Sequence, residues 1–124
     1  MGQGYILDSN VIIDLVAEKL PSNVFKQLSD SLLFTSVISR IEVLGFQTTK
    51  LEEEKFISLF EDLQTLSLTE EVVLKTILIR KTNKIKLGDA IIAATALVYD
   101  LKLLTRNVSD FKRIEGLEVL SSHD

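Results

Sequence analysis

Residues 87–105 read LGDAIIAATALVYDLKLLT, and this stretch decides the fold class of the chain. Its first part, 87–99, is apolar at almost every position and rich in alanine, which is typical of a helix that is buried on nearly all sides. The following segment, 102–105, is a short apolar run of strand length. A buried helix followed by a buried strand indicates an α/β domain, in which helices cover both faces of a mainly parallel sheet.

The rest of the sequence continues this alternation. Thr49 and Glu52 have the spacing of a capping box, and Thr69 precedes two acidic residues in the first turn of a helix, where the helix dipole favours them. The predicted strands are 5–7, 32–35, 66–68, 102–105 and 117–120, with a polar loop at 106–110. The predicted helices are 11–16 behind a cap at 8–10, then 21–28, 37–46, 50–63, 70–82 and 87–99.

Composition restricts the class of protein. The chain has 124 residues, 46% of them hydrophobic, and a single proline, which predicts one domain over residues 1–124 without a linker. It has no cysteine, which excludes disulfides, thiolate zinc sites and thiol nucleophiles. Residues 1–4 lack the features of a signal peptide, and no apolar run is long enough to span a bilayer. We therefore expect a cytoplasmic protein.

Three acidic residues stand apart from those at helix starts. Asp8 directly follows the first predicted strand, at the sheet edge where α/β proteins bind ligands. Glu42 interrupts an apolar helical segment, and Asp89 lies in the first turn of the buried helix. Each has a structural alternative, because Asp8 and Asp89 are also suited to capping helices and Glu42 to facing solvent.

Together, these carboxylates indicate a site for a hard divalent cation. Several carboxylates at close range do not all stay ionised unless a cation neutralises them. Oxygen ligands without cysteine favour Mg²⁺ or Mn²⁺ over zinc or copper, and such an ion can activate water for phosphodiester hydrolysis. The single histidine, His123, lies near the C-terminus, where we expect a disordered surface residue.

Four segments resemble the motifs of PIN-domain ribonucleases, specifically the VapC toxins of type II toxin–antitoxin systems. The segment 6–12, ILDSNVI, is similar to the hydrophobic-Asp-Thr/Ser-Asn start of that family. The segment 36–45, SVISRIEVLG, matches its Ser-x5-Glu-x2-Gly helix, and 87–96, LGDAIIAATA, is the most specific match. The fourth segment is 104–111, LTRNVSDF. The motifs occur in family order and at family spacing over essentially the whole chain.

The resemblance implies a three-layer α/β/α PIN-like domain in which Asp8, Glu42 and Asp89 bind Mg²⁺ or Mn²⁺. It also implies that Ser9 and Asn10 support the site by hydrogen bonding. Family members with four clear acids have aspartate where this chain has Asn107, and Asp110 follows three residues later. The fourth site residue is therefore either Asn107, in a catalytic role, or Asp110, as a metal ligand.

The implied function is a metal-dependent endoribonuclease that acts as a toxin, forms a homodimer and is held inactive by a cognate antitoxin protein. A net charge of −4 and a pI near 5.0 argue against binding of RNA, although bound cations would reverse the charge at the site. Six basic residues near the third and fourth motifs are either phosphate-binding candidates or ordinary surface charges. They are Lys81, Lys84, Lys86, Arg106, Lys112 and Arg113.

Two alternatives from other classes remain. The asparagine at 107 motivates a PIN-like module that binds RNA or protein without cleaving RNA. An aspartate after an early strand also occurs in phosphoacceptor receiver domains, but these need an acidic pair before that strand, and residues 2–4 contain none.

Overall fold

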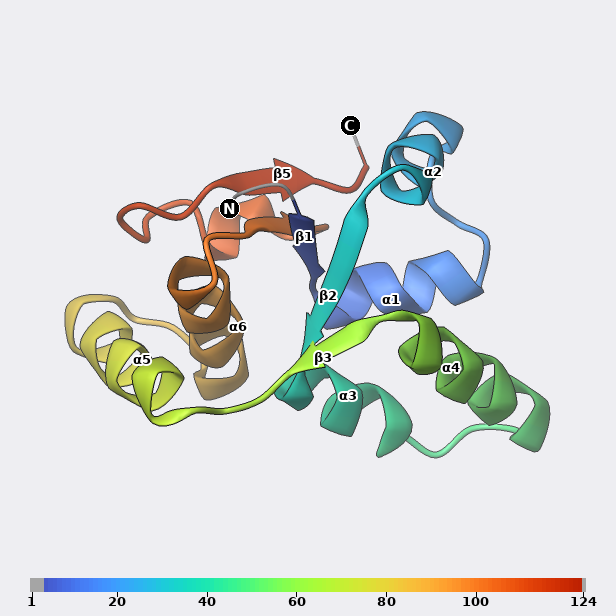
Figure 1. Ribbon diagram of the computed structural model, residues 1–124, viewed down its shortest axis with the longest axis horizontal. Helices are drawn as coiled ribbons and strands as arrows, with labels where there is room; N and C mark the ends of the chain where they lie inside the picture. The colour runs from blue at the N-terminus through green and yellow to red at the C-terminus, as the bar shows by residue number, and fades with distance from the viewer. Residues whose placement is uncertain (1–3, 124) are drawn as a thin grey trace.

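The computed structural model describes residues 4–123. Residues 1–3, on which the expectation of a start without a signal peptide partly rests, and residue 124 lie outside the described part. Within residues 4–123, strands alternate with helices (Figure 1). The elements are β1 (Gly4–Leu7), α1 (Ser9–Val16), α2 (Ser22–Ser29), β2 (Leu32–Ser36), α3 (Val37–Leu44), α4 (Lys50–Asp62), β3 (Gln64–Leu66), α5 (Glu70–Thr82), α6 (Leu87–Val98), β4 (Lys102–Thr105), the 3₁₀ helix η1 (Val108–Asp110) and β5 (Val119–Ser121).

The strands form one parallel sheet in the order β3-β2-β1-β4-β5. β1 is central, and its last residue, Leu7, pairs with Leu104 of β4. The strand order reverses at β1, since β2 and β3 lie on one side of it and β4 and β5 on the other. Ligand sites of open α/β sheets lie at the carboxyl ends of strands beside such a reversal. Receiver domains have the order 2-1-3-4-5, so the strand order contradicts that alternative.

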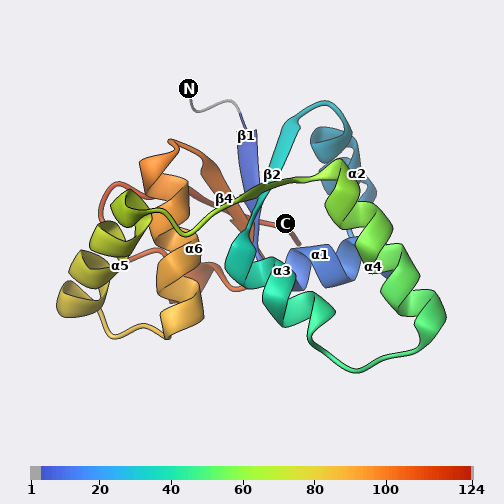
Figure 2. The ribbon, with the colours of Figure 1, turned by 60° about the horizontal axis from the view of Figure 1, so that its bottom comes forward.

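Helices cover both faces of the sheet, which confirms the three-layer prediction. Figures 1 and 2 show α5 and α6 on one side of the strands and α1, α2 and α4 on the other. Ile6 and Leu103 pack in the cluster with α5 and α6, while Leu7 and Leu104 pack in the cluster with α1, α2 and α4. Adjacent residues serve opposite faces because side chains alternate along a strand.

The predicted helix at 87–99 is α6, which ends one residue earlier, at Val98. Residues 90–96 are all buried, and the alanines among them allow the helix to pack closely between the sheet and α5. Ile92 is 1% exposed, and full burial of such a side chain stabilises the fold by about 1.5–3 kcal/mol. Over the described part of the chain, no helix combines the length and the apolar character that a membrane span requires.

Two strands begin two residues away from their predicted starts, while β1 and β2 differ from the prediction by one residue. β3 ends at Leu66, because Ser36–Leu66 is its last pair with β2 and Thr69 then caps α5. Leu68, which was expected inside this strand, is 47% exposed. β5 begins at Val119 instead of 117, after Gly116 turns the chain at φ 82°. The expected polar loop at 106–110 contains the short helix η1.

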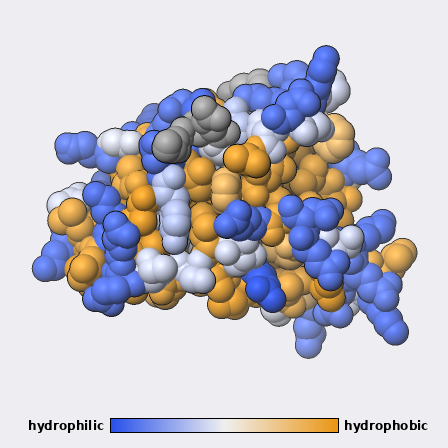
Figure 3. Space-filling view, viewed as in Figure 1, coloured by the Kyte–Doolittle hydropathy of each residue, from blue (hydrophilic) through white to orange (hydrophobic). Residues whose placement is uncertain are grey.

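One helix presents an apolar face to solvent. Leu74, Ile77 and Leu78 of α5 are 58%, 47% and 53% exposed. Figure 3 shows apolar surface over the position that α5 occupies in Figure 1. This face is outside the two buried clusters and is therefore available for contact with another molecule.

Candidate active site

Asp8 lies at the carboxyl end of β1 and is 5% exposed. Its Oδ1 accepts a hydrogen bond from the backbone N–H of Ser9 at 2.8 Å, and its Oδ2 accepts one from the Thr105 hydroxyl at 2.7 Å. Asp8 is also the N-cap residue of α1, as its structural alternative predicted. Capping uses Oδ1 only, while Oδ2 is bound by Thr105. Burial raises the pKa of Asp8, the two hydrogen bonds oppose the rise, and the nearby charges of Glu42 and Asp110 add to it.

Glu42 projects from α3 and is exposed, which agrees with the alternative prediction that it faces solvent. Its carboxylate is nevertheless held beside the other acids. Oε1 accepts a hydrogen bond from the Ser9 hydroxyl at 2.8 Å. A Cβ atom added to Gly88 would lie 3.1 Å from Oε2, so the glycine before Asp89 leaves room for this carboxylate. Glu42 is therefore next to both the start of α1 and the start of α6.

Asp89 lies in the first turn of α6, where Lys86 is the N-cap residue. The capping alternative for Asp89 is therefore wrong. The pKa of Asp89 is raised to about 6, mainly by partial burial and then by the negative charges of three other carboxylates. In decreasing order of effect these are Asp8, Asp110 and Glu42, while Lys86 opposes the rise. Asp89 is thus within electrostatic reach of the other three acidic side chains.

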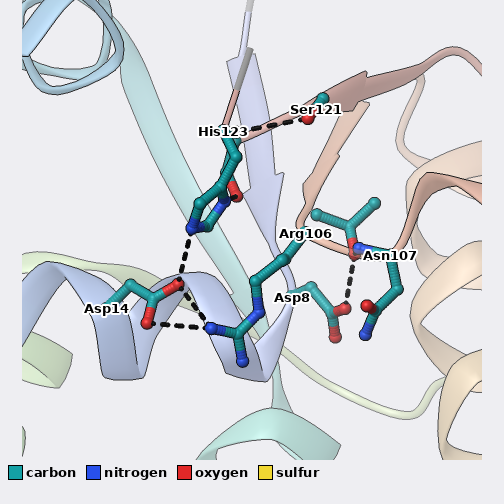
Figure 4. A network of polar contacts seen from close by, with 8 residues as sticks. Asp8, Asp14, Arg106, Asn107, Ser121 and His123 are labelled. Carbon is teal, nitrogen blue, oxygen red and sulfur yellow. Dashed lines mark hydrogen bonds and ion pairs between the residues drawn. The ribbon is translucent and has the colours of Figure 1, made fainter. Parts of the chain in front are cut away.

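Both candidates for the fourth position follow β4. The backbone N–H of Asn107 donates to the Thr105 hydroxyl at 3.0 Å, and Thr105 in turn donates to Asp8. Figure 4 shows the Asn107 side chain pointing into the same space as the Asp8 carboxylate. Asp110 ends η1, and its charge raises the pKa of both Asp8 and Asp89. Asn107 is thus connected to the site by hydrogen bonds and Asp110 by charge.

The two residues expected to support the site differ in their contacts. Ser9 joins Asp8 to Glu42, because its backbone N–H donates to the former and its hydroxyl to the latter. Asn10 is half-buried in α1, and no hydrogen bond of its side chain is present within residues 4–123. The supporting role of Asn10 stays a prediction.

The donor set fits Mg²⁺ or Mn²⁺, because it consists of hard oxygen ligands whose repulsion a divalent cation would relieve. Across the described residues, no group of three acidic or histidine side chains already converges on one ion position. Mg²⁺ commonly binds through one or two carboxylates, keeps several waters and uses substrate phosphate as a further ligand. The wider spacing of these carboxylates suits such a water-rich site.

Thr105 is the residue of this site to which the sequence analysis assigned no role. A recognisable signal was present, because Thr105 ends an apolar strand just as Asp8 follows one. Since β1 and β4 are adjacent and parallel, with Leu7 opposite Leu104, their next residues meet at the same sheet edge. This signal becomes readable only when the strand order is known.

A second polar network lies beside the first (Figure 4). The Nη1 atom of Arg106 is 3.3 and 3.2 Å from Oδ1 and Oδ2 of Asp14, whose side chain is 4% exposed. Nε2 of His123 is 3.5 Å from the same carboxylate, and the backbone N–H of His123 donates to the Ser121 hydroxyl at 3.2 Å. His123 is therefore at the surface, as expected, but it is held by these contacts, so the expectation of disorder is wrong. Arg106 pairs with a buried carboxylate, which gives it a structural role beside the strand that carries Thr105.

Comparison with known proteins identifies the family. A sequence model of the PIN domain matches residues 5–117. The chain belongs to the PIN-domain family. Its relatives place it among the VapC ribonucleases: it is 31% identical over 128 residues to Ribonuclease VapC1 of Rickettsia felis, covering 95% of this chain and 96% of that protein.

Solved structures of similar fold agree with this assignment. One is a toxin–antitoxin complex from Klebsiella pneumoniae, with a TM-score of 0.80, 27% identity and coverage of 98% of this chain and 99% of the other. Another is VapBC-1 from nontypeable Haemophilus influenzae, with a TM-score of 0.82, 28% identity and coverage of 94% and 96%. The match extends over nearly the whole of each chain, so the sequence-based expectation of a PIN-like fold is confirmed.

Proposed function

We propose that this PIN-domain protein is a Mg²⁺- or Mn²⁺-dependent endoribonuclease that acts as the toxin of a toxin–antitoxin pair. The observation that carries the proposal is the gathering of Asp8, Glu42 and Asp89 at the strand-order reversal of a parallel sheet. Hydrogen bonds from Ser9 orient Asp8 and Glu42, and Gly88 leaves room for the Glu42 carboxylate. The charges of Asp8 and Glu42 both raise the pKa of Asp89. The sequence similarity to VapC ribonucleases supports RNA as the substrate.

In this proposal Asp8, Glu42 and Asp89 hold the cation, with Asn107 or Asp110 as the fourth site residue. When bound, the cation supplies positive charge for the scissile phosphate and activates the attacking water. In the hydrolysis that this chemistry would support, a water oxygen would bond to phosphorus as one P–O ester bond breaks. One RNA fragment would keep the phosphate, and the released oxygen of the other would take up a proton to become a hydroxyl group.

The protein's own contribution is to orient the carboxylates and, at Asp8, to oppose the effect of burial on its pKa through hydrogen bonds. Thr105 holds Oδ2 of Asp8, and Ser9 holds Oδ1 of Asp8 together with Oε1 of Glu42. Both hydrogen bonds of Asp8 favour its ionised form, which is the form that binds a cation. These contacts fix two carboxylates from different elements before substrate arrives, and catalysis depends on such preorganisation.

Cleavage of a labelled RNA pool by highly purified protein tests the proposal. We expect cleavage with Mg²⁺ or Mn²⁺, none with EDTA, and losses of at least 100-fold in Asp8→Asn and Asp89→Asn. The exposed Asp30→Asn, at the end of α2, is the matched control and should cleave normally. Undiminished cleavage by Asp8→Asn would contradict the proposal. Metal-independent RNA binding without cleavage would favour the non-catalytic module that Asn107 motivates.

The proposed antitoxin would cover an apolar groove of about 300 Å³ between α1, α3 and α4. Ile13, Val43 and Phe56 line it together with Phe46, which is 74% exposed, and Glu42 belongs to the same wall. A protein segment seated there would lie against the cation-binding carboxylates and exclude RNA. Solved structures at 27% and 28% identity that contain toxin–antitoxin complexes support a protein partner of this kind.

The partner is tested by measuring binding to a small protein encoded beside this gene, where an antitoxin is expected. Phe46→Ser should weaken that complex at least tenfold, because the groove loses its most exposed aromatic side chain. Phe25→Ser is the matched control, since Phe25 is 55% exposed on α2, outside the groove. Equal weakening by both substitutions would contradict the groove as the binding surface.

Three further parts of the proposal concern the state of the protein. A homodimer is supported by the exposed apolar face of Leu74, Ile77 and Leu78 on α5, and light scattering of the wild type and Leu78→Lys tests it. A cytoplasmic location follows from cellular RNA as substrate. A single domain over residues 1–124 stays a prediction, which limited proteolysis tests.

A further inference from the structure

A cleft of about 440 Å³ lies between the α5–α6 connection and the segment that contains η1. Asp89 and Asp110 form part of its wall, so it opens directly onto the carboxylates of the proposed active site. Elsewhere the wall is basic and polar, with Asn83, Lys84 and Lys86 from the connection and with Ser109 and Arg113 from the other side. Ile85 and Ile114 add apolar surface.

The structure divides the six basic residues near the third and fourth motifs into separate groups. Lys84, Lys86 and Arg113 line the cleft. Arg106 is paired with Asp14, and Lys81 and Lys112 are exposed but outside the cleft wall. None of the three basic residues of the cleft forms an ion pair with another described residue. Their charges are therefore available to an anionic ligand.

We propose that this cleft binds a single unstacked nucleotide of the RNA strand next to the scissile phosphate, an inference that rests on the proposed function. Lys84, Lys86 and Arg113 supply positive charge for the neighbouring phosphate, while the scissile phosphate meets the carboxylates through the cation. Asn83 and Ser109 offer hydrogen-bonding groups to the ribose or base. Acidic and basic groups on one continuous wall match a polymer of linked phosphates, because one phosphate needs the cation and the next needs the lysines.

The dimensions indicate the substrate class. A volume of about 440 Å³ lies in the range of pockets for one small ligand, roughly 300–1,000 Å³. One nucleotide fits such a space, whereas a base pair within a duplex does not. Proteins that read unpaired RNA take splayed-out bases from loops and single strands. The cleft therefore selects single-stranded segments, and a continuous duplex is excluded from this position.

The test measures binding in EDTA, separately from cleavage. A labelled single-stranded RNA is titrated with wild type, Lys84→Gln, Arg113→Gln and the double variant over a range of salt concentrations. Each substitution should weaken binding about 3- to 10-fold and lower the salt-dependence slope by about 0.7, the value for one phosphate contact on a single strand. Lys86 is left unchanged because it also affects the pKa of Asp89.

Lys81→Gln and Lys112→Gln are matched controls, since they remove the same charge nearby but outside the cleft wall. Both should bind RNA like the wild type. If the controls weaken binding as much as Lys84→Gln and Arg113→Gln, the effect is one of net charge and the cleft assignment is overturned. A fully paired RNA of the same sequence should bind at least tenfold more weakly, and equal binding of the duplex would also overturn it.

The two proposals fail in different ways. Metal-dependent cleavage together with unchanged binding by the Lys84→Gln/Arg113→Gln variant would overturn the cleft assignment alone. Cleft-dependent binding without any metal-dependent cleavage would overturn the proposed function, and the cleft would then be an RNA-binding site of a module that does not cleave.

Discussion

The Thr105 hydroxyl donates a hydrogen bond to Oδ2 of Asp8 at 2.7 Å and so joins the ends of two neighbouring parallel strands. Thr105 is fully buried, and its hydroxyl also accepts from the backbone N–H of Asn107. One side chain thereby connects the carboxylate of the first motif with the backbone of the fourth. We infer that Thr105 is a positioning residue, which acts on catalysis through Asp8.

Replacing Thr105 with valine should therefore change the pH dependence of cleavage. The hydrogen bond from Thr105 lowers the pKa of Asp8, so its removal raises that pKa further. Asp8 is then ionised only at higher pH, and the acidic limb of the pH–rate profile moves to higher pH. Loss of a partner at a buried carboxylate also costs about 1–3 kcal/mol of stability. Thr105→Ser should restore the wild-type profile, whereas superimposable profiles for valine and threonine would contradict the positioning role.

Removal of the Asp89 charge should stabilise the cation-free protein at neutral pH. Its pKa rises from 3.8 to about 6 on folding, so its contribution to stability is complete below pH 3.8 and is lost as pH rises through 6. In EDTA, Asp89→Asn should be more stable than wild type at pH 7.5 by about 1 kcal/mol after allowance for solvent screening. At pH 3.5 the two should be equal. Urea denaturation measures both values, and equal stability at pH 7.5 would contradict the raised pKa.

Divalent cations should raise the melting temperature of the wild type. A cation that binds only the folded state stabilises it by RT ln(1 + [L]/Kd), or about 1.4 kcal/mol at tenfold excess over Kd. Differential scanning fluorimetry with Mn²⁺ at pH 7.5 should show this shift, and Asp8→Asn should lose most of it. Asp30→Asn should keep it. A shift of the same size in Asp8→Asn would place the cation elsewhere.

Gly88→Ala should separate stability from activity. The new Cβ would lie 3.1 Å from Oε2 of Glu42, so the carboxylate has to move by a few tenths of an ångström. Alanine is also favoured over glycine inside a helix by up to about 1 kcal/mol. We expect equal or higher stability with cleavage lowered about tenfold, because the moved carboxylate no longer matches the cation position. Chemical denaturation and cleavage rates together check this, and full activity would show that Glu42 tolerates the shift.

Arg106→Ala should destabilise the fold, because it removes the arginine partner of the buried Asp14 carboxylate and leaves the His123 imidazole, 3.5 Å away, as its neighbour in this network. Breaking a fully buried pair costs about 3–5 kcal/mol, and the 44% exposure of the Arg106 side chain reduces the expected loss to about 2 kcal/mol. In the double variant Asp14→Asn/Arg106→Ala the loss should be smaller than in Arg106→Ala alone. Urea denaturation of the double-mutant cycle measures the coupling, and additive effects would contradict the pairing.

Features fixed by local pattern were predictable from the sequence. Residues 90–96 are buried because this part of α6 is apolar on almost every side, and the acids at 8, 42 and 89 stood out from their apolar surroundings. Expecting Asp8 at the ligand-binding edge of the sheet required only a parallel α/β fold. The four motifs also identified the family, because they retain its spacing.

Features that depend on strand order were not predictable in this way. Thr105 becomes a partner of Asp8 only because β4 lies beside β1, and nothing local to 102–105 specifies that neighbour. The pairing of Asp14 with Arg106 likewise joins residues 92 positions apart. Asp14 and Glu42 both lie in apolar helical segments. Their local sequence patterns do not show that Asp14 forms a buried ion pair whereas Glu42 lies beside the candidate active site.

The separation of 97 positions between Asp8 and Thr105 has a consequence for protein synthesis. The ribosome makes β1 well before β4, so this strand lacks one of its two neighbours until β4 has left the exit tunnel. Chains fold during translation from the N-terminus, and distant pairings form late. A nascent chain thus carries Asp8 and Glu42 long before it carries Asp89 and Thr105. RNA beside the translating ribosome is consequently protected until the segment that carries Asp89 and Thr105 has emerged.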